Sequence, residues 1–340
     1  MWSRSDAPNI MIVRLSAIGD SILTLPVLNA LRDHFPRARI SWMIADSCAP
    51  ILRGHRSLDD LIEVKRGWLR SPRAIRQLRR RLHDMRLDVT IDAQGLAKSA
   101  LPAWLSGAKQ RIGFDQADRE GREFSTWLNN DLVRPDASHV VDRNLGLLKP
   151  LGIDNPSVRF DIPEHALEVK AAEDYIDRKT LQRGFAVLNI NAAWLSKRWA
   201  TERFAPVARY LADRYGLASV LPWGNDQERG QVESVAAQVP NHAVVLPKFS
   251  LTQLGSLFRR AKLFIGSDTG PLHLANAVGT RCIGLYGRAV ARSGIYGPQG
   301  IVLCHNHVTE NGAMRRSKNN DVMRLISVDE VCQACDQMLS

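Results

Sequence analysis

Short apolar runs alternate with amphipathic stretches along most of the chain. Residues 10–15 are apolar at every position except Arg14, residues 263–265 are apolar throughout, and residues 87–91 are apolar except for Asp88 and Thr90. Such runs are typical of strands that are buried on both faces of a parallel sheet. Between the runs, apolar residues recur three and four positions apart, most clearly in 72–86, where arginines occupy the remaining positions. The alternation predicts strands joined by helices.

The first half of the chain contains one such series. We predict strands at 10–15, 40–44, 61–64, 87–91 and 110–113, and helices at 21–34, 72–86, from about 96, and at 138–151. Pro26 predicts either a kink in the helix at 21–34 or a later start of that helix, because proline has no N–H to donate.

Residues 152–165 interrupt the pattern with Gly, Pro and Asp, and a second series follows. We predict strands at 185–190, 217–222, 243–245, 263–265 and 282–286, and helices at 165–179, 202–214, 226–237, 250–260 and 272–278. The fold class is therefore α/β, with two Rossmann-like doubly wound domains facing a cleft. The domains are expected at 1–160 and 161–340. A helix at about 327–340 ends the second series, and packing of this helix back on the N-terminal domain is one expected arrangement.

Composition limits the class of protein. The chain has 340 residues, 45% hydrophobic and 24% charged, as in globular proteins. No apolar run approaches the roughly 20 residues that span a bilayer, and the N-terminus lacks the apolar core of a signal peptide. We therefore expect a cytoplasmic protein. Its five cysteines are too few and too scattered for a disulfide framework.

The net charge of +11 is concentrated in one place. Residues 65–86 contain nine Lys or Arg and one acid, Asp84. A basic patch of this kind predicts an anionic partner, which could be nucleic acid, acidic lipid or a phosphorylated substrate. The plainer alternative is that the arginines only form a solvated helix face.

The segment 263–287 combines a strand, a turn at Gly266 to Gly270, and a helix of small and apolar residues. Unpaired N–H groups and the positive end of the helix dipole at such a turn favour an anion such as phosphate. The alternative is an ordinary connection, with Asp268 or Thr269 as N-cap and Pro271 in the first turn.

The common fingerprints of other enzyme classes are absent. The sequence has no G-x-G-x-x-G after the first strand and no G-x-x-x-x-G-K-[ST], which disfavours dehydrogenases and P-loop ATPases. Cysteine and histidine gather near the C-terminus, at Cys304, His305, His307, Cys332 and Cys335. A zinc site there would need four ligands, and we favour a surface loop and a plain last helix, with no metal.

Six motifs resemble one known family. In the first half they are Arg14-Leu-Ser-Ala-Ile-Gly-Asp20 with Leu25-Pro26, then Ile91-Asp-Ala-Gln-Gly-Leu-Ala-Lys-Ser99 and Arg111-Ile-Gly-Phe114; in the second half they are Lys197-Arg-Trp199, Leu221-Pro-Trp-Gly224 and Asp268-Thr-Gly-Pro-Leu-His273. In this order they resemble glycosyltransferase family 9, the ADP-heptose:lipopolysaccharide heptosyltransferases. The resemblance implies the GT-B fold, with a nucleotide-sugar donor held by the C-terminal domain and a lipid-linked sugar acceptor held by the N-terminal domain.

The resemblance implies an inverting transfer with Asp20 as general base. One carboxylate near the acceptor hydroxyl suffices for such a reaction. Without the resemblance, Asp20 would be interpreted as the N-cap of the following helix.

The resemblance also implies the residues that hold the donor. Lys197, assisted by Arg198, would place positive charge on the diphosphate. Ala192 and Ala193 depart from the family, which commonly has small hydroxyl residues there, so Asn191 or Ser196 is expected to replace them. The other donor contacts implied are Trp223, Gly224, Asp226 (with Glu228 as its rival), Asp268, Thr269, Gly270 and His273.

For the acceptor, the resemblance supports Lys98, near Gln94 at the start of a helix. Arg66, Arg70 and Arg73 are candidates for acidic groups of the acceptor or for anionic lipid of the inner leaflet, which would place the protein peripherally on the inner face of the inner membrane. No cofactor is expected, since the nucleotide sugar is a substrate.

Two other classes stay open. One is another GT-B enzyme, such as an epimerase or a transferase with a different sugar donor. The other is a nucleic-acid-binding protein, which we disfavour because the arginines lack interleaved aromatic residues.

Overall fold

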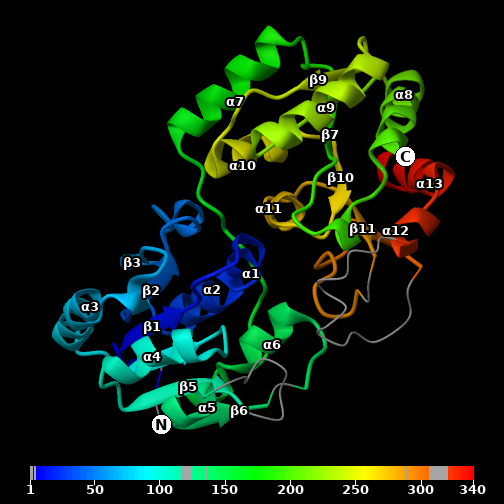
Figure 1. The fold of residues 1–340 in the computed structure, drawn as a ribbon. Coiled ribbons are helices and arrows are strands. Elements are labelled where there is room, and N and C mark those ends of the chain that lie inside the picture. Colours follow the sequence, from blue (N-terminus) through cyan, green and yellow to red (C-terminus); the bar gives the residue numbers. More distant parts are fainter. Residues whose placement is uncertain (1–2, 4, 116–123, 135, 288–289, 306–320) are drawn as a thin grey trace. The chain divides into compact units, whose positions relative to one another are not determined.

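The computed structural model describes residue 3 and residues 5–115, 124–134, 136–287, 290–305 and 321–340. The chain divides into two compact units, Met1–Pro163 and Glu164–Ser340 (Figure 1). The division falls within the Gly, Pro and Asp-rich segment, three residues after the expected boundary at 160.

The N-terminal unit is built on a parallel sheet of six strands in the order β3-β2-β1-β4-β5-β6. The strands are β1 (Asn9–Val13), β2 (Arg39–Ala45), β3 (Asp60–Val64), β4 (Val89–Asp92), β5 (Gln110–Phe114) and β6 (Asp131–Val133). The helices are α1 (Ile18–Ile22), α2 (Leu25–His34), α3 (Pro72–Asp84), α4 (Ala97–Leu105), α5 (Ser125–Leu128) and α6 (Val140–Gly146).

Helices α3, α4 and α5 pack side by side, and α2 packs on α6. Leu78 and Leu82 of α3 and Leu105 of α4 share one apolar core with Met11 and Val13 of β1. Strands β4, β5 and β6 succeed one another in one direction across the sheet, and right-handed crossovers then place their helices on one face. The arginines of α3 are therefore on the outside of a helix layer.

The C-terminal unit repeats the same topology, with the order β12-β11-β10-β7-β8-β9. Its strands are β7 (Phe185–Asn189), β8 (Ala218–Leu221), β9 (Ala243–Val245), β10 (Leu263–Ser267), β11 (Cys282–Tyr286) and β12 (Gly300–Cys304). Its helices are α7 (Ala166–Arg178), α8 (Phe204–Tyr215), α9 (Asp226–Gln238), α10 (Leu251–Arg260), α11 (Gly270–Ala277), α12 (Asp321–Leu325) and α13 (Val328–Leu339). Both sheets thus have the strand order of a dinucleotide-binding Rossmann domain, and the predicted α/β class is confirmed.

The expected helices at 21–34 and 138–151 are each divided at a proline. The first becomes α1 and α2, with Thr24 before α2 and Pro26 in its first two positions, so the later start is confirmed. The second ends at Gly146 and is followed by a short 3₁₀ turn, Lys149–Leu151, that contains Pro150. Proline lacks the N–H that an α-helix interior needs.

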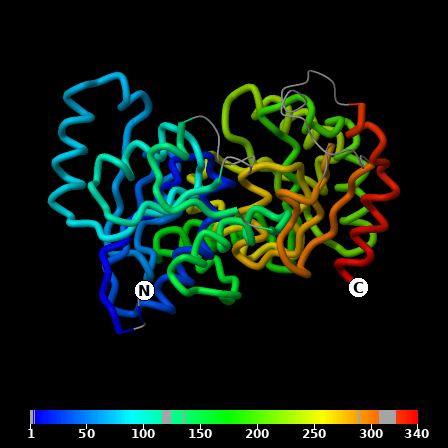
Figure 2. The backbone as a smooth tube through the Cα atoms, turned by 90° about the horizontal axis from the view of Figure 1, so that it is seen from below, coloured from blue at the N-terminus to red at the C-terminus, as the bar shows by residue number. Residues whose placement is uncertain are grey.

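The last helix, α13, belongs to the C-terminal unit. Helix α13 packs on α8 and β12 of its own unit, as the red chain end in Figure 2 shows. Val331 and Cys335 are buried in the core of that unit. Asp336 accepts hydrogen bonds from the hydroxyls of Tyr210 (2.6 Å) and Tyr215 (2.5 Å) on α8. The apolar face of α13 therefore covers part of the C-terminal sheet.

Among the described residues, no helix combines the length and the hydropathy that a membrane span requires.

Candidate functional site

Each sheet has one point where the winding of the chain reverses. In the N-terminal unit this point lies between β1 and β4, and in the C-terminal unit it lies between β7 and β10. Loops at the carboxyl ends of two such strands diverge and leave a crevice, where open α/β sheets bind their ligands. Asp20 follows β1 and Lys98 follows β4, while Lys197 follows β7 and Asp268 follows β10, so both reversal points carry predicted site residues.

In the C-terminal unit, three predicted residues from the β7 and β10 loops form one cluster. Lys197 Nζ donates to Asp268 Oδ2 at 2.5 Å and to the Asp268 carbonyl at 3.0 Å. His273 Nε2 lies 3.1 Å from Asp268 Oδ1. Because a carboxylate oxygen only accepts, Nε2 carries the proton. Asp268 thereby fixes both neighbours, and the ammonium of Lys197 keeps a third N–H for a ligand.

Asp268 is held as a carboxylate. Burial opposes its charge, but the hydrogen bond from His273 and the positive charge of Lys197 outweigh burial and lower the pKa of Asp268 well below its usual range. A carboxylate repels phosphate, so this geometry suits Asp268 to hold Lys197 and His273 in place and to accept hydrogen bonds, rather than to contact a diphosphate directly.

Helix α11 begins beside this cluster without a side-chain cap. Thr269 occupies the N-cap position but its side chain caps no N–H of the helix. Its Oγ1 donates to the Ser267 carbonyl (3.1 Å) and accepts from Asn189 Nδ2 (3.3 Å). The first N–H groups of a helix have no intrahelical partner, so those of Gly270 and Leu272 suit an anion.

The loop after β7 carries two more of the predicted donor-binding residues, Asn191 and Ser196. Asn191 and Ser196 are 7% and 4% exposed, and Asn191 Nδ2 and Ser196 Oγ have no hydrogen-bond partner among the described residues. Buried polar atoms are normally paired, so these two atoms fit a polar ligand. Arg198 differs, because its Nε donates to the Ala192 carbonyl at 2.7 Å and so holds the loop in shape.

The loop after β8, next to β7 in the sheet, distinguishes the two acids considered for ribose. Glu228 accepts from the Gly224 N–H at 2.8 Å and donates its own N–H to Asn225 Oδ1, the N-cap of α9. Asp226 is exposed in the first turn of α9. Trp223 is tied to the Leu246 carbonyl through Nε1 (2.6 Å). Glu228 is thus used to close the loop, and Asp226 is not.

In the N-terminal unit, Asp20 is held at the start of α1. Its Oδ1 pairs with Arg14 Nη2 at 3.1 Å and its Oδ2 accepts from the Ala17 N–H at 3.3 Å, while 46% of the side chain is exposed. Arg14 is 5% exposed and also donates to the Ala93 carbonyl. The carboxylate therefore has a fixed position and an accessible surface. Arg14 was detectable in the sequence as the one charge within an apolar strand.

A buried carboxylate that belongs to the second motif, but to which the motif assigned no role, lies at the end of β4. Asp92 Oδ1 accepts from the N–H groups of Gln94 (3.1 Å) and Gly95 (3.0 Å), and Asn129 Nδ2 lies 3.4 Å from Oδ2. Burial raises the pKa of Asp92. Gln94, predicted to bind acceptor, is itself buried and accepts from the Leu15 N–H at 2.8 Å. This network joins the β4 loop to the β1 loop that carries Asp20.

The remaining predicted acceptor residues lie on the surface. Lys98 is exposed on α4. Arg66 and Arg70 are exposed after β3, and Arg73 is exposed on α3. Since β3 is the edge strand and β1 is third from that edge, the strand order does not bring these arginines to the reversal point.

The described residues contain no cluster of three or more potential metal ligands. His305 Nε2 pairs with Glu330 Oε1 at 2.7 Å, and Cys332 and Cys335 lie on α13. His307 lies outside the described residues.

Comparisons with known proteins agree with this geometry. The sequence model of glycosyltransferase family 9 (heptosyltransferase) matches residues 75–321. Lipopolysaccharide heptosyltransferase 1 of Pseudomonas aeruginosa is 28% identical over 291 residues, which are 82% of this chain and 78% of that protein. Lipopolysaccharide heptosyltransferase 3 of Escherichia coli is 27% identical over 275 residues, 79% of this chain and 80% of that protein.

Solved structures extend the similarity to both units. The structure of the E. coli heptosyltransferase WaaC with ADP has a TM-score of 0.73 and 25% identity, and the alignment covers 97% of each chain. A family 9 glycosyl transferase from Veillonella parvula has a TM-score of 0.85 and 24% identity, covering 100% of this chain and 98% of that one.

Proposed function

This chain belongs to glycosyltransferase family 9, and from that premise we propose that it is an inverting heptosyltransferase of lipopolysaccharide core biosynthesis. The donor is an ADP-heptose-like nucleotide sugar bound by the C-terminal unit, and the acceptor is a lipid-linked anionic saccharide bound by the N-terminal unit. The names of the similar curated proteins support the reaction class, and the WaaC structure with ADP supports the nucleotide.

One observation carries the assignment of the donor site. Lys197, with an N–H to spare, and the uncapped start of α11 lie in the same unit as two buried polar side chains, Asn191 and Ser196, that lack partners among the described residues. A diphosphate offers the oxygens that all of these donors need. In this proposal Asp226 binds the ribose hydroxyls, Trp223 and Gly224 shape the wall beside it, and Arg198 holds the loop.

The proposed chemistry is one displacement. Asp20 takes the proton of the acceptor hydroxyl, whose oxygen attacks the anomeric carbon of the donor sugar on the face opposite the diphosphate. The bond from that carbon to the diphosphate breaks, and ADP leaves with the electron pair. Lys197, Thr269, Gly270 and His273 stabilise the charge that develops on the leaving group. A single displacement inverts the configuration.

Acceptor binding is assigned to Lys98 and to Arg66, Arg70 and Arg73, which offer cations to acidic groups, with Gln94 shaping the loop. Because such an acceptor is embedded in a bilayer, we place the protein peripherally on the inner face of the inner membrane.

The donor assignment is tested by thermal shift with ADP-, UDP-, GDP- and dTDP-sugars. ADP-sugar is expected to raise the melting temperature most, since ligand that binds only the folded state stabilises it by mass action. Equal or stronger stabilisation by UDP-sugar would contradict the ADP assignment.

The role of Asp20 is tested by Asp20→Asn, with Asp154→Asn, at an exposed acid of the same unit, as control. Loss of a general base is expected to lower turnover by about 10²–10⁴-fold, while donor affinity and melting temperature stay close to those of the parent. If Asp20 only stabilised the helix start, the melting temperature would fall and turnover would persist.

A further inference from the structure

The helix layer formed by α3, α4 and α5 carries two kinds of exposed side chain that the transfer reaction does not explain. One kind is the exposed arginines of α3 that have no role in the proposed acceptor binding, which are Arg76, Arg79, Arg80 and Arg81. The other is a group of large aromatic residues on α4 and α5. Because α3 packs on α4 and α4 packs on α5, the two kinds lie on neighbouring elements of one layer.

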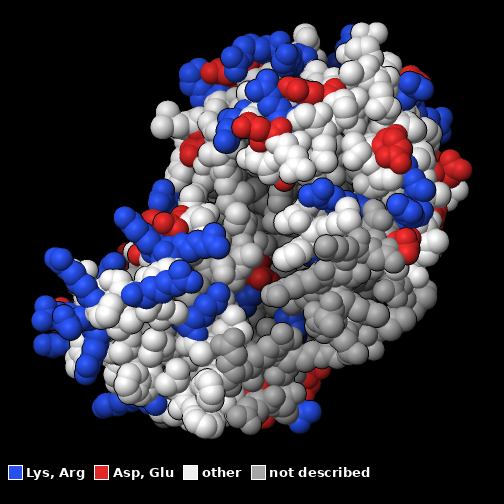
Figure 3. All heavy atoms as spheres, viewed as in Figure 1, with Lys and Arg blue, Asp and Glu red and all other residues white. Residues whose placement is uncertain are grey.

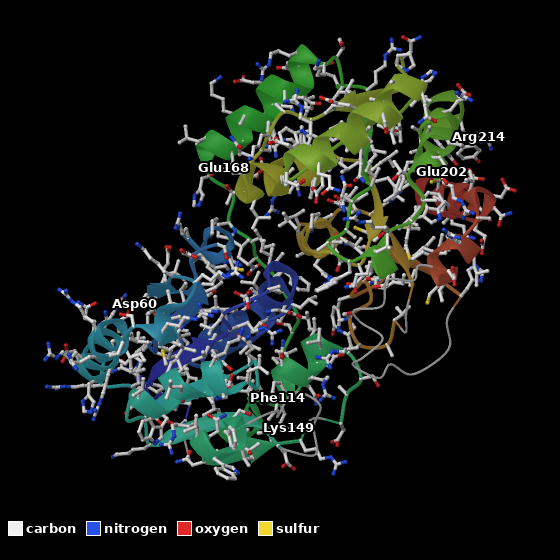
Figure 4. All side chains as sticks on the ribbon, in the orientation of Figure 1. Asp60, Phe114, Lys149, Glu168, Glu202 and Arg214 are labelled. Atoms are coloured by element: carbon white, nitrogen blue, oxygen red, sulfur yellow. The ribbon has the colours of Figure 1, made fainter. Side chains whose placement is uncertain are left out.

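The cations of the layer lack acidic partners. All nine Lys and Arg of residues 65–86 are exposed, and none of them has a carboxylate within salt-bridge distance in the part of the chain that the structure describes. The acids of the adjoining segment are already used: Asp59 pairs with Arg32, Asp60 with Arg39 and Glu63 with Arg53. Figure 4 labels Asp60 at the start of β3.

Among the described residues of the N-terminal unit, no salt bridge therefore neutralises this positive charge. Figure 3 shows Lys and Arg side chains gathered over the part of this unit where Figure 1 draws α3. A patch of uncompensated cations attracts an anionic surface.

The aromatic residues are unusually exposed for their size. Trp104 at the end of α4 is 53% exposed, and Phe124 and Trp127 at α5 are 62% and 75% exposed. Phe124 and Trp127 contact each other edge to face, with ring centroids 5.3 Å apart. Leu69, in the turn before α3, is 38% exposed among the arginines. Solitary exposed apolar residues are ordinary, but a group of them marks an interaction site.

We propose that the outer face of the α3–α4–α5 layer is a docking surface for an anionic lipid bilayer. Arginines above a negatively charged leaflet supply long-range attraction. Tryptophan prefers the boundary between headgroups and hydrocarbon, where its ring is buried and its N–H donates to water or to a headgroup. The combination of unpaired cations with exposed tryptophan favours a bilayer over a protein partner, because a bilayer satisfies both without a shaped pocket. The surface rests on the peripheral placement proposed above and names the face that meets the membrane; because it requires no glycan, it can fail while the transfer reaction stands.

The test is co-sedimentation with vesicles of phosphatidylcholine alone or with phosphatidylglycerol, at salt concentrations below and above about 0.1 M, where charge interactions are screened beyond about 10 Å. The wild-type chain is expected to bind only the anionic vesicles and to be released by salt. The triple variant Arg76→Gln, Arg79→Gln, Arg80→Gln leaves the proposed acceptor residues intact and is expected to weaken binding on the order of 100-fold, about fivefold per cation. Lys179→Gln, Arg183→Gln, Arg209→Gln removes three exposed cations of the C-terminal unit and is the matched control, with little loss.

The aromatic part is tested by Trp104→Ser with Trp127→Ser, against Leu167→Ser, which removes an 82% exposed apolar side chain of α7. The tryptophan variant is expected to bind roughly tenfold more weakly with its salt dependence retained, and the control is expected to bind as the wild type does. Circular dichroism and melting temperature verify that each variant is folded.

Three results would overturn the proposal: no binding of the wild type to anionic vesicles at low salt, equal losses in the matched controls, or tighter binding to nonspecific DNA than to vesicles at the same salt. A dimer in sedimentation that Trp127→Ser dissociates would assign the aromatic group to a second copy instead. Because the vesicles contain no acceptor, these outcomes are independent of turnover. An active enzyme that ignores vesicles would refute the docking surface alone.

Discussion

At the scale of single residues, Lys197 has two roles that one experiment can separate. Lys197→Ala removes a charge-assisted contact worth roughly 1.5–3 kcal/mol, so donor affinity should fall about tenfold or more in calorimetry. It also leaves Asp268, whose side chain is only 19% exposed, without its cationic partner, so the melting temperature should fall as well.

The double variant Lys197→Ala, Asp268→Asn is the control. Neutralising Asp268 removes the uncompensated charge, so stability should return towards that of the parent, whereas donor affinity should stay low. Recovery of donor affinity in the double variant would show that Lys197 does not bind the diphosphate.

Asp92 gives a prediction with a defined pH dependence. Its pKa is raised in the folded state, so the stability that its protonated form contributes is lost as the pH rises through the folded pKa. In Asp92→Asn this loss is absent, and the amide oxygen can still accept from Gln94 and Gly95. The free energy of unfolding of the variant, relative to the parent, should therefore rise as the pH increases above about 4, the pKa of an ordinary aspartate. A constant difference measured by urea titration at several pH values would contradict it.

The sequence motifs located Lys197, Asp268 and His273, but not the way in which one carboxylate joins the other two side chains. Lys197 and Asp268 are 71 positions apart, and only the adjacency of β7 and β10 brings them together. The motifs also identified Asp20 without its salt bridge to Arg14. That pairing depends on the conformation of the loop between the two residues, which the sequence does not reveal.

At the scale of elements, an acidic capping residue at the uncapped start of α11 should increase stability and weaken ligand binding. Thr269→Asp supplies a capping carboxylate worth about 0.5–2 kcal/mol, so the melting temperature without ligand should rise. The same carboxylate repels a diphosphate, so ADP-sugar should bind more weakly. Thr269→Asn caps without charge and is the control. If ADP-sugar binds the Asp variant as well as the Asn variant, the diphosphate does not lie at this helix start.

The elements most accessible from sequence were those buried on both faces. β7 and β10 are buried throughout. Their short apolar runs fit a buried strand better than an amphipathic helix. The patterns did not predict β6 and β12, which are edge strands of their sheets. Edge position alone does not explain this, because the edge strands β3 and β9 were predicted. β6 has only three residues, one of which is the charged Asp131, so it gives no apolar run of its own.

At the scale of the whole molecule, each unit has its own core, so the proposed division of labour predicts two separable responses to heat. ADP-sugar at about 100 times its dissociation constant should stabilise the unit that binds it by about 2.7 kcal/mol and raise one calorimetric transition. Ile62→Ala, at a fully buried position of the N-terminal unit, should lower the other transition by removing about 2–5 kcal/mol. If both changes move the same transition, the donor is not held by the C-terminal unit.

The position of α13 has a consequence for the order in which the protein is made. The ribosome completes residue 163 long before residue 340, so the N-terminal unit is expected to fold while the rest is still being translated. The C-terminal core includes Val331 and Cys335 from the last helix, and Trp199 donates to the carbonyl of Ile326 (2.9 Å) just before that helix. This unit is expected to fold only after the final residues emerge. A nascent chain arrested before residue 328 should therefore resist protease in its first unit and be cleaved in its second.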